Sequence, residues 1–213
     1  MPDHKLLPRT GAKAAGGLLA AIAAIVLAVV GVEGGYVDNP NDPGGKTNHG
    51  VTEKVARQHG YTGSMRNLPV EKAIEIYGAD YVVAPGFDRI VQRNVALGEE
   101  LVDQGANFGP QRPSCWLQSA LNALNRQGRD YGDLAVDCRV GPATAAAYDA
   151  LVRQRGARTA CELLIKLMDA QQGAEYLRLV QRNAKLETFV PGWIDHRLGN
   201  VPIARCAEGG VRG

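Results

Sequence analysis

The sequence predicts a mostly α-helical protein with at most one short β-hairpin. Apolar side chains recur at helical spacing along most of the chain, whereas strand-like alternation is scarce. Several of these stretches are bounded by residues that begin or end helices. With 213 residues, the chain is long enough for one sizeable hydrophobic core or two small ones.

The composition excludes several classes of protein. Hydrophobic residues make up 45% and charged residues 22%, as in a globular protein rather than a disordered one. A formal net charge of +2 provides no strong field for nucleic acid, so we expect no nucleic-acid partner. The histidines and cysteines lack zinc-site spacing, so we expect no metal and no cofactor. We also expect a monomer.

The cysteines leave the redox compartment open. In an oxidising compartment they would form two disulfides, with three possible connectivities. In a reducing compartment they would be buried or inert thiols. The four are Cys115, Cys138, Cys161 and Cys206.

An uncharged apolar run occupies residues 14–32. As a helix it would measure roughly 28 Å, just enough to cross the hydrocarbon core of a bilayer. Lys5, Arg9 and Lys13 precede it, so the positive-inside rule places the N-terminus in the cytoplasm. The run is weakly hydrophobic, because it holds nine Leu, Ile or Val and ten Ala or Gly. Its insertion is favourable by only ~3–5 kcal/mol.

Four interpretations of this run compete. It is a signal peptide cleaved after Gly31 with Val29 at the −3 position, a permanent anchor, a marginal span that later leaves the membrane intact, or a buried core helix. Glu33 follows the run without a linker, and a mere anchor would usually be joined to its cargo by one. This favours the marginal span.

The next stretch indicates a loop followed by two helices. Residues 36–50 are rich in Gly, Pro, Asn and Asp, and a short hairpin is expected within 36–52. Thr52 can cap a helix that runs to about His59, with Gly60 as its stop. Pro69 opens another helix, with one apolar face formed by Val70, Ala73, Ile74 and Tyr77.

The rest of the chain is predicted to be helical. One helix is expected from about Arg89 to Asn107, and the stretch 107–114 is the best internal boundary. The apolar positions of that helix are Ile90, Val91, Leu97, Leu101 and Val102. Further helices are expected near 113–127, 141–155, 157–172 and 174–187.

Three polar residues after the apolar run suggest glycosidase chemistry. Glu33 could be a protonated acid that donates to the leaving oxygen, because its apolar neighbours raise a carboxyl pKa. Asp42 could activate a water molecule that Thr47 holds, and carboxyls about 6.5–9.5 Å apart would give inversion. Spacing alone is a weak signal, since the same residues also suit a capped loop.

A longer motif makes the signal specific. EGGYVDNPNDPGGKTNHGVT, residues 33–52, resembles the signature of glycoside hydrolase family 108, muramidases of phages and bacteria similar to the phage-type lysozymes of family 24. Downstream, three stretches resemble the peptidoglycan-binding module that usually follows this catalytic region: CWLQSALN (115–122), DLAVDCRVGPAT (133–144) and FVPGW (189–193). Cys138 stands where that module usually carries Gly.

The resemblance implies a lysozyme-like, two-lobed fold and a set of site residues. The catalytic acid is Glu33; Asp42 and Thr47 match the second carboxylate and the hydroxyl, with Asp38 as a rival carboxylate. Substrate-binding residues would be Tyr36, Asn48 and His49, although for His49 alone a surface loop position is the simpler interpretation. Trp116 and Trp193 could stack on sugars, but at helical spacing a core position is more usual.

The whole arrangement resembles a signal-anchor-release endolysin. Such an enzyme waits, tethered and inactive, at the periplasmic face of the host inner membrane until a holin collapses the membrane potential. The expected domains are a membrane segment (1–32), a muramidase region (33–108), a peptidoglycan-binding module that completes the body (109–195) and a tail (196–213). The substrate would be the β-1,4 bond between N-acetylmuramic acid and N-acetylglucosamine in peptidoglycan glycan strands.

Two other functions remain open at this point. A lytic transglycosylase would cut the same bond without water and leave 1,6-anhydro ends. A membrane-tethered peptidoglycan-binding protein with a degenerate site would not cut it at all. The sequence does not determine the host, the stereochemical outcome or the fate of residues 1–32.

Overall fold

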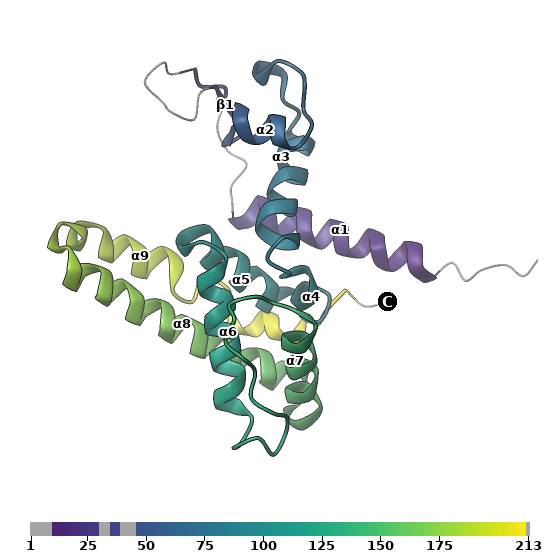
Figure 1. Ribbon diagram of the computed structural model, residues 1–213, viewed down its shortest axis with the longest axis vertical. Coiled ribbons are helices and arrows are strands. Elements are labelled where there is room, and N and C mark those ends of the chain that lie inside the picture. Colours follow the sequence, from purple (N-terminus) through teal and green to yellow (C-terminus); the bar gives the residue numbers. More distant parts are fainter. Residues whose placement is uncertain (1–9, 30–34, 39–45, 212–213) are drawn as a thin grey trace, which may run out of the picture.

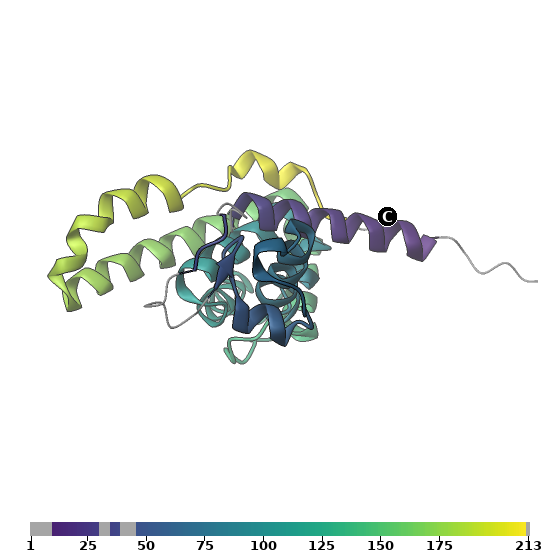
Figure 2. The ribbon, with the colours of Figure 1, turned by 90° about the horizontal axis from the view of Figure 1, so that it is seen from above.

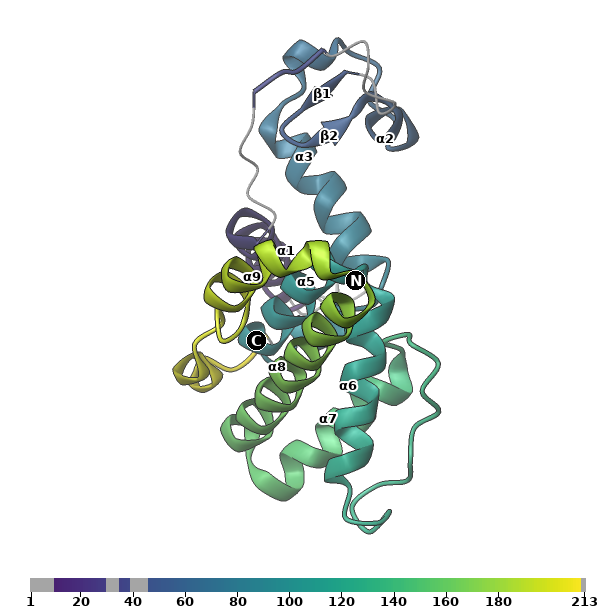
Figure 3. The ribbon, with the colours of Figure 1, turned by 90° about the vertical axis from the view of Figure 1, so that its left-hand side faces the viewer.

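The computed structural model describes residues 10–29, 35–38 and 46–211, with the side chains of the first helix described from Gly16 onward. It has the mostly α-helical, lysozyme-like fold that the sequence predicts. A small lobe lies above a larger helical lobe, and one helical segment connects the two (Figure 1). Seen after a turn of 90°, this segment, residues 70–83 and hereafter the connecting rod, runs from one lobe to the other (Figure 3).

Helix α1 (Thr10–Val29) packs one face against the large lobe. Ile22, Ile25 and Val26 are 7%, 1% and 0% exposed and belong to the main hydrophobic core. Their partners come from α3, α4 and α5, so this helix touches both the large lobe and the rod that carries the small one. Among the residues with described side chains, no helix combines the length and apolarity needed to cross a membrane.

The small lobe contains the predicted hairpin and two helices. Thr52 caps the first helix as expected, its Oγ1 accepting from the Val55 N–H at 3.4 Å, and Pro69 directly precedes the second. A separate core of Val51, Ala56, Met65, Leu68, Ala73 and Ile76 holds the lobe together. The elements are β1 (Thr47–Asn48), β2 (Val51–Thr52), α2 (Glu53–Gln58), the 3-10 turn η1 (Met65–Asn67) and α3 (Val70–Tyr77).

The connecting rod is α3 and its π-helical continuation η2 (Gly78–Val83). Beyond it, the single helix predicted over 89–107 is wrong: the chain forms α4 (Asp88–Val91) and α5 (Val95–Phe108). Asn94 causes the break, because its extended backbone starts a new helix and its side chain accepts from the Leu97 N–H at 3.0 Å.

The large lobe is completed by the second half of the chain. The two helices predicted at 157–172 and 174–187 are one long helix, and Gly173 lies inside it. This helix and the segment after it project from the body as a hairpin (Figure 2). The elements are α6 (Gln111–Leu124), α7 (Pro142–Arg155), α8 (Ala157–Arg182), η3 (Ala184–Phe189), α9 (Val190–Arg197) and η4 (Ile203–Ala207).

One core and two disulfides unite the large lobe. Its buried residues run from Ile22 to Cys206, so α1 and the last 3-10 turn share one hydrophobic cluster. The four cysteines pair as Cys115–Cys138 and Cys161–Cys206. The second bridge is buried and joins α8 to η4, which fixes the C-terminal segment on the core.

Two carboxyl groups of α5 are buried in this lobe. Glu100 is 0% exposed; one oxygen accepts from Gln104 Nε2 at 2.6 Å and the other has no partner among the described residues. Burial raises the pKa of the Glu100 carboxyl well above its usual range, and nearby Asp169 and Asp103 raise it further. Burial also raises the pKa of the Asp103 carboxyl, but Asp103 accepts from Arg197 Nη1 at 2.7 Å, and this cation opposes the shift.

We predict that Glu100→Gln stabilises the protein at neutral pH. The pKa of Glu100 is higher in the folded protein than in the unfolded chain, where it has the ordinary value of 4.5. The protein therefore has its full stability below pH 4.5, where Glu100 is protonated in both states, and loses stability as the pH rises through the folded-state pKa. Gln keeps an acceptor but does not titrate. Urea unfolding at pH 7 should show a gain of at least about 1 kcal/mol, vanishing near pH 4.

Glu99→Gln is the matched control. Glu99 accepts from Arg205 at 2.7 Å, so removal of its charge should lower stability slightly at pH 7. A Glu100→Gln variant that is less stable than the wild type at pH 7 would contradict the prediction.

Candidate active site

The predicted site residues that the structure describes lie in the small lobe. Tyr36, Thr47, Asn48 and His49 belong to the extended segment and hairpin at its edge. Glu33 and Asp42 lie outside the described residues, in the stretches 30–34 and 39–45. The residues on either side of each stretch are described.

Paired backbone lies close to both ends of the stretch that carries Asp42. Val37 and Thr47 form an antiparallel bridge, with Val37 N–H donating to the Thr47 carbonyl at 2.8 Å and Thr47 N–H donating back at 2.9 Å. Thr47 also pairs with Thr52 in the hairpin. Backbone hydrogen bonds on two sides therefore hold Thr47, the predicted water-positioning residue.

The hairpin turn needs the residues found in it. His49 and Gly50 have φ values of 50° and 73°, and positive φ at both central positions is the requirement of a type I′ turn. A Cβ on Gly50 would lie 2.4 Å from Tyr77 Oη, so a larger residue would clash. Tyr77 Oη donates to the His49 carbonyl at 3.3 Å, which ties the turn to the connecting rod.

Asn48 anchors the hairpin from inside the lobe. Its side chain is 5% exposed, and Nδ2 donates to the carbonyls of Met65 and Arg66 at 2.8 and 3.3 Å. Both donors are thus used within the protein, so a sugar contact would have to come from the amide oxygen. The substrate-binding role of Asn48 stays a prediction.

Tyr36 and Asp38 form a polar pair on the extended segment. Tyr36 Oη donates to Asp38 Oδ2 at 2.9 Å, and partial burial together with this hydrogen bond raises the pKa of Tyr36. The Arg66 guanidinium lies over the Tyr36 ring, 4.2 Å from its centroid. Sequence spacing does not reveal Arg66, because thirty residues separate it from Tyr36.

The end of helix α1 fixes the position from which the chain continues to Glu33. The helix ends at Val29 against the large lobe, and Gly35 lies in the small lobe. A Cβ on Gly78 would lie 3.0 Å from Ile22 Cγ2, so α1 and the connecting rod are closely packed. The predicted acid therefore belongs to the stretch that joins the two lobes.

Comparison with known families assigns this region. Residues 26–109 match the family Glycosyl hydrolase 108, and residues 112–198 match the family Predicted Peptidoglycan domain. The chain carries a glycosyl hydrolase 108 domain followed by a peptidoglycan domain. Because the first family is a glycoside hydrolase family, the protein is a glycoside hydrolase, and the two matches together support a lysozyme-like activity on peptidoglycan.

A solved structure is similar over most of its length. It is described as "Structure of Brucella abortus SagA", with 25% sequence identity and a TM-score of 0.55. The alignment covers 89% of this chain and 95% of the Brucella abortus chain. No curated protein sequence matches significantly.

The two matched domains share one core instead of forming separate bodies. The glycosyl hydrolase 108 domain supplies the end of α1, the small lobe, the rod, α4 and α5. The peptidoglycan domain supplies α6 to α9. Of these, α6 and α8 pack against α5, and α6, α7 and α8 contribute buried residues to the same hydrophobic cluster. The catalytic domain thus depends on the peptidoglycan domain for its large lobe.

The loop that carries Cys138 is fixed within the peptidoglycan domain and rests on the glycosyl hydrolase 108 domain. Cys138 adopts a φ of 62°, a left-handed conformation that Gly adopts easily, and it is linked to Cys115 on α6. Nearby, a Cβ on Gly86 would lie 2.1 Å from the Val140 carbonyl oxygen, so this loop rests directly on the glycosyl hydrolase 108 domain. The cysteine at the usual glycine position keeps the turn and adds a covalent link.

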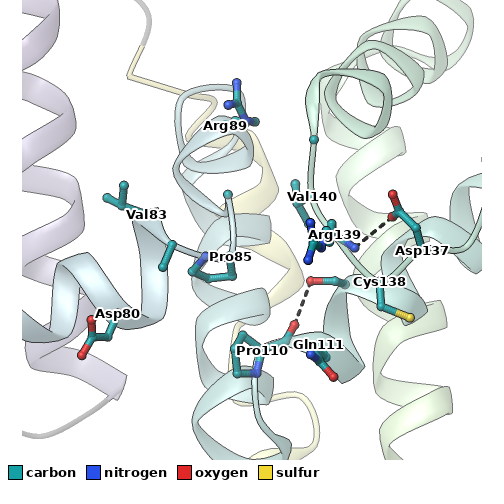
Figure 4. Close-up of a pocket in the computed structure, with 14 residues that line it drawn as sticks. Asp80, Val83, Pro85, Arg89, Pro110, Gln111, Asp137, Cys138, Arg139 and Val140 are labelled. Carbon is teal, nitrogen blue, oxygen red and sulfur yellow. Dashed lines mark hydrogen bonds between the residues drawn. The ribbon is translucent and has the colours of Figure 1, made fainter.

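An open cavity of about 820 Å³ lies at this junction. Figure 4 shows Asp80, Val83 and Pro85 on one side and the loop from Asp137 to Val140 on the other. None of the described residues predicted for the site lines it. The cavity is therefore distinct from the described part of the candidate active site.

The two tryptophans have different environments. Trp116 on α6 is 9% exposed and belongs to the core region, in agreement with the more usual position for a Trp at helical spacing. Trp193 on α9 is half-buried and lines a second cavity.

We predict that Asn48→Ala destabilises the small lobe. The change removes two donors, and the Met65 carbonyl keeps only the longer bond from the Leu68 N–H at 3.3 Å, so we expect a cost of about 1–2 kcal/mol. The midpoint temperature of thermal unfolding and the rate at which a peptidoglycan suspension clears should both fall. The control is Asn67→Ala, because Asn67 is exposed. A variant that is as stable as the wild type but inactive would instead indicate a direct contact with sugar.

Proposed function

We propose that the protein is an N-acetylmuramidase that hydrolyses the β-1,4 bond between N-acetylmuramic acid and N-acetylglucosamine. The observation that carries the proposal is the match of residues 26–109 to the Glycosyl hydrolase 108 family, a range that includes Glu33, Asp42 and Thr47. The positions of the described residues on either side of these stretches also support the proposal. The end of α1 and the Val37–Thr47 bridge provide two attachment points for the polar stretches, one from each lobe.

The proposed chemistry uses two carboxyl groups and a hydroxyl. Glu33 donates its proton to the glycosidic oxygen as the bond to the leaving sugar breaks. Asp42, or its rival Asp38, removes a proton from the attacking water, which Thr47 holds by its hydroxyl. Asp38 already accepts from Tyr36, and this bond lowers its availability as a base. Asp42 is therefore the preferred second carboxylate.

We predict that Glu33→Gln lowers the rate of peptidoglycan hydrolysis at least about a hundredfold, because the amide cannot supply the proton. Glu53→Gln is the matched control, since Glu53 is partly exposed and pairs with Arg57 on α2. Full activity of Glu33→Gln would favour a peptidoglycan-binding protein that is not itself a catalyst, with the hydrolysis of peptidoglycan carried out by another enzyme.

The reaction products separate hydrolysis from transglycosylation. We expect mass spectrometry of the released fragments to show reducing N-acetylmuramic acid ends. Fragments one water lighter, with 1,6-anhydro ends, would identify a lytic transglycosylase instead. Asp42→Asn and Asp38→Asn, compared in the same assay, identify the second carboxylate.

The membrane part of the proposal rests on the two faces of α1. Its body-facing residues are apolar, as docking requires, but so are those that face outward. Leu19 and Leu27 are 68% and 50% exposed, and no charged residue occurs among residues 16–29. A helix that only packs against a soluble body usually carries charges on its outer face. An outer face of this kind suits a helix that also resides in a bilayer.

The disulfides support an exported protein. All four cysteines are paired, and such bonds persist in oxidising compartments such as the periplasm. We therefore propose a phage endolysin, tethered by residues 14–32 to the host inner membrane with its body in the periplasm. Holin action releases the segment, α1 docks on the large lobe, and Glu33 reaches its working position.

We predict that collapse of the membrane potential transfers the intact chain from membranes to the soluble periplasm with a gain of activity. Cell fractionation before and after an uncoupler, with intact mass and activity in each fraction, measures this. Soluble, active protein that begins near Val32 from the outset would mean a cleaved signal peptide. The muramidase would then stand without the release mechanism.

Three outward alanines make the test sharper. Ala20, Ala24 and Ala28 are exposed on docked α1, so Leu at all three should leave docking intact. Membrane insertion should become more favourable by about 1–2 kcal/mol, and less protein should be released. The triple Ser variant is the matched control and should shift the distribution the opposite way.

A further inference from the structure

Five aromatic rings form a continuous row through the peptidoglycan domain and the end of α5. Trp116 meets Phe108 at 5.4 Å between ring centroids, Phe108 meets Tyr176 at 5.3 Å, and Tyr176 meets Trp193 at 5.1 Å. Phe189 continues the row, 6.1 Å from Trp193. Exposure is lowest at Tyr176, at 3%, and highest at Phe189, at 55%. The row therefore has its most buried ring in the middle and its most exposed ring at Phe189.

The last rings lie nearly parallel. The planes of Tyr176 and Trp193 differ by 25°, and those of Trp193 and Phe189 by 20°. Tyr176 is 3% exposed, so the buried ring supports the two outer ones. Phe189, which is 55% exposed, and the partly exposed Trp193, hereafter the aromatic platform, are therefore nearly parallel rings that reach the surface.

Helix α9 holds the platform in a fixed position. Trp193 rests on Tyr176, and Arg197, one helical turn later, donates to buried Asp103 at 2.7 Å. Tyr176 Oη in turn accepts from Gln172 Nε2 at 2.8 Å. A stacking contact and an ion pair thus fix the two ends of one helical turn, so the platform needs little ordering when a ligand binds.

Polar groups surround the platform in an open cavity of about 520 Å³. Thr188, His196 and Arg197 line the cavity beside the two rings, and a Cβ on Gly192, which also lines it, would meet no atom within 4 Å. Aromatic faces suit the C–H face of a sugar ring. Hydrogen-bonding groups at the edge suit its hydroxyl, acetamido and carboxylate groups.

Helix α9, which carries Trp193, lies on the side of the molecule where α1 ends. Figures 1 and 2 both show α9 beyond the C-terminal end of α1, where the chain leaves for the stretch that carries Glu33. The platform also falls within the residues that match the peptidoglycan domain family, 112–198. A polymer bound at the junction of the lobes could reach it.

We infer that the Phe189–Trp193 platform is a glycan-binding subsite that holds sugar rings of a peptidoglycan strand away from the bond being cut. The inference rests on the proposed function for the identity of the polymer, but it concerns binding rather than cleavage. Arg197 and His196 would contact the acetamido and lactyl groups that distinguish this glycan from a plain hexose polymer.

Binding of the full chain to insoluble peptidoglycan tests the subsite. Phe189→Ala should weaken binding to purified sacculi at 4 °C about tenfold, as expected for an aromatic anchor. Phe189→Leu keeps an apolar side chain without a ring and should weaken binding similarly, whereas Phe189→Trp should restore it. Ile194→Ala is the control, because Ile194 is 41% exposed on the same helix but does not line the cavity.

A second measurement reports directly on the platform. In Trp116→Phe, Trp193 is the remaining tryptophan, since the sequence holds two. Oligomers of N-acetylglucosamine should change the fluorescence of Trp193 and protect it from quenching by acrylamide. In Phe189→Ala, the oligomer concentration needed for half of this protection should rise about tenfold.

The outcomes separate this inference from the proposed function. The sacculus experiment is run in both the wild-type and the Glu33→Gln chain. Weaker binding of Phe189→Ala in both chains supports the subsite whether or not either chain cuts glycan. Unchanged binding of Phe189→Ala, or wild-type binding of Phe189→Leu, would overturn it even if Glu33 proves to be the catalytic acid.

Discussion

The burial of one face of α1 is the contact on which the rest of the structure depends. Ile22, Ile25 and Val26 complete the core of the large lobe, while Ile22 also packs against Gly78 on the rod that carries the small lobe. A single helix therefore sets the position of both lobes and of the point where the chain departs toward Glu33. Without this contact the large lobe would lose part of its core, and the two lobes would lose a common support.

The same contact is of moderate strength. Full burial of three such side chains contributes about 4–9 kcal/mol relative to water. The apolar run would gain about 3–5 kcal/mol on entering a bilayer, on its nine Leu, Ile and Val residues. Two environments that differ by a few kcal/mol can exchange when conditions change. The abundance of Ala and Gly in the run keeps the membrane value low, so in the proposed mechanism docking competes with insertion.

The peptidoglycan domain combines structural and binding tasks. It completes the core of the glycosyl hydrolase 108 domain, and its loop at Cys138 is fixed by a disulfide and by the close approach of Val140 to Gly86. Among the buried carboxyl groups of α5, Asp103 pairs with Arg197 of α9, whereas Glu100 forms no ion pair with a described residue. This interior holds α9 in place and leaves the outer rings exposed. Rigidity at the platform thus comes from the lobe that also supports catalysis.

The sequence by itself determined the helical class, the hairpin within 36–52, the capping of α2 by Thr52 and the family motif, because these depend on neighbouring residues. It did not separate α4 from α5 or join the two halves of α8, since Asn94 and Gly173 act through caps and packing that local spacing does not reveal. It left the disulfide pairing open and gave no sign that Arg66 covers Tyr36. Only the tertiary structure paired the cysteines, aligned Phe108, Tyr176, Trp193 and Phe189, and placed a potential membrane segment against the core. These features depend on contacts between residues far apart in the chain, and such contacts are set by the packing of the whole fold.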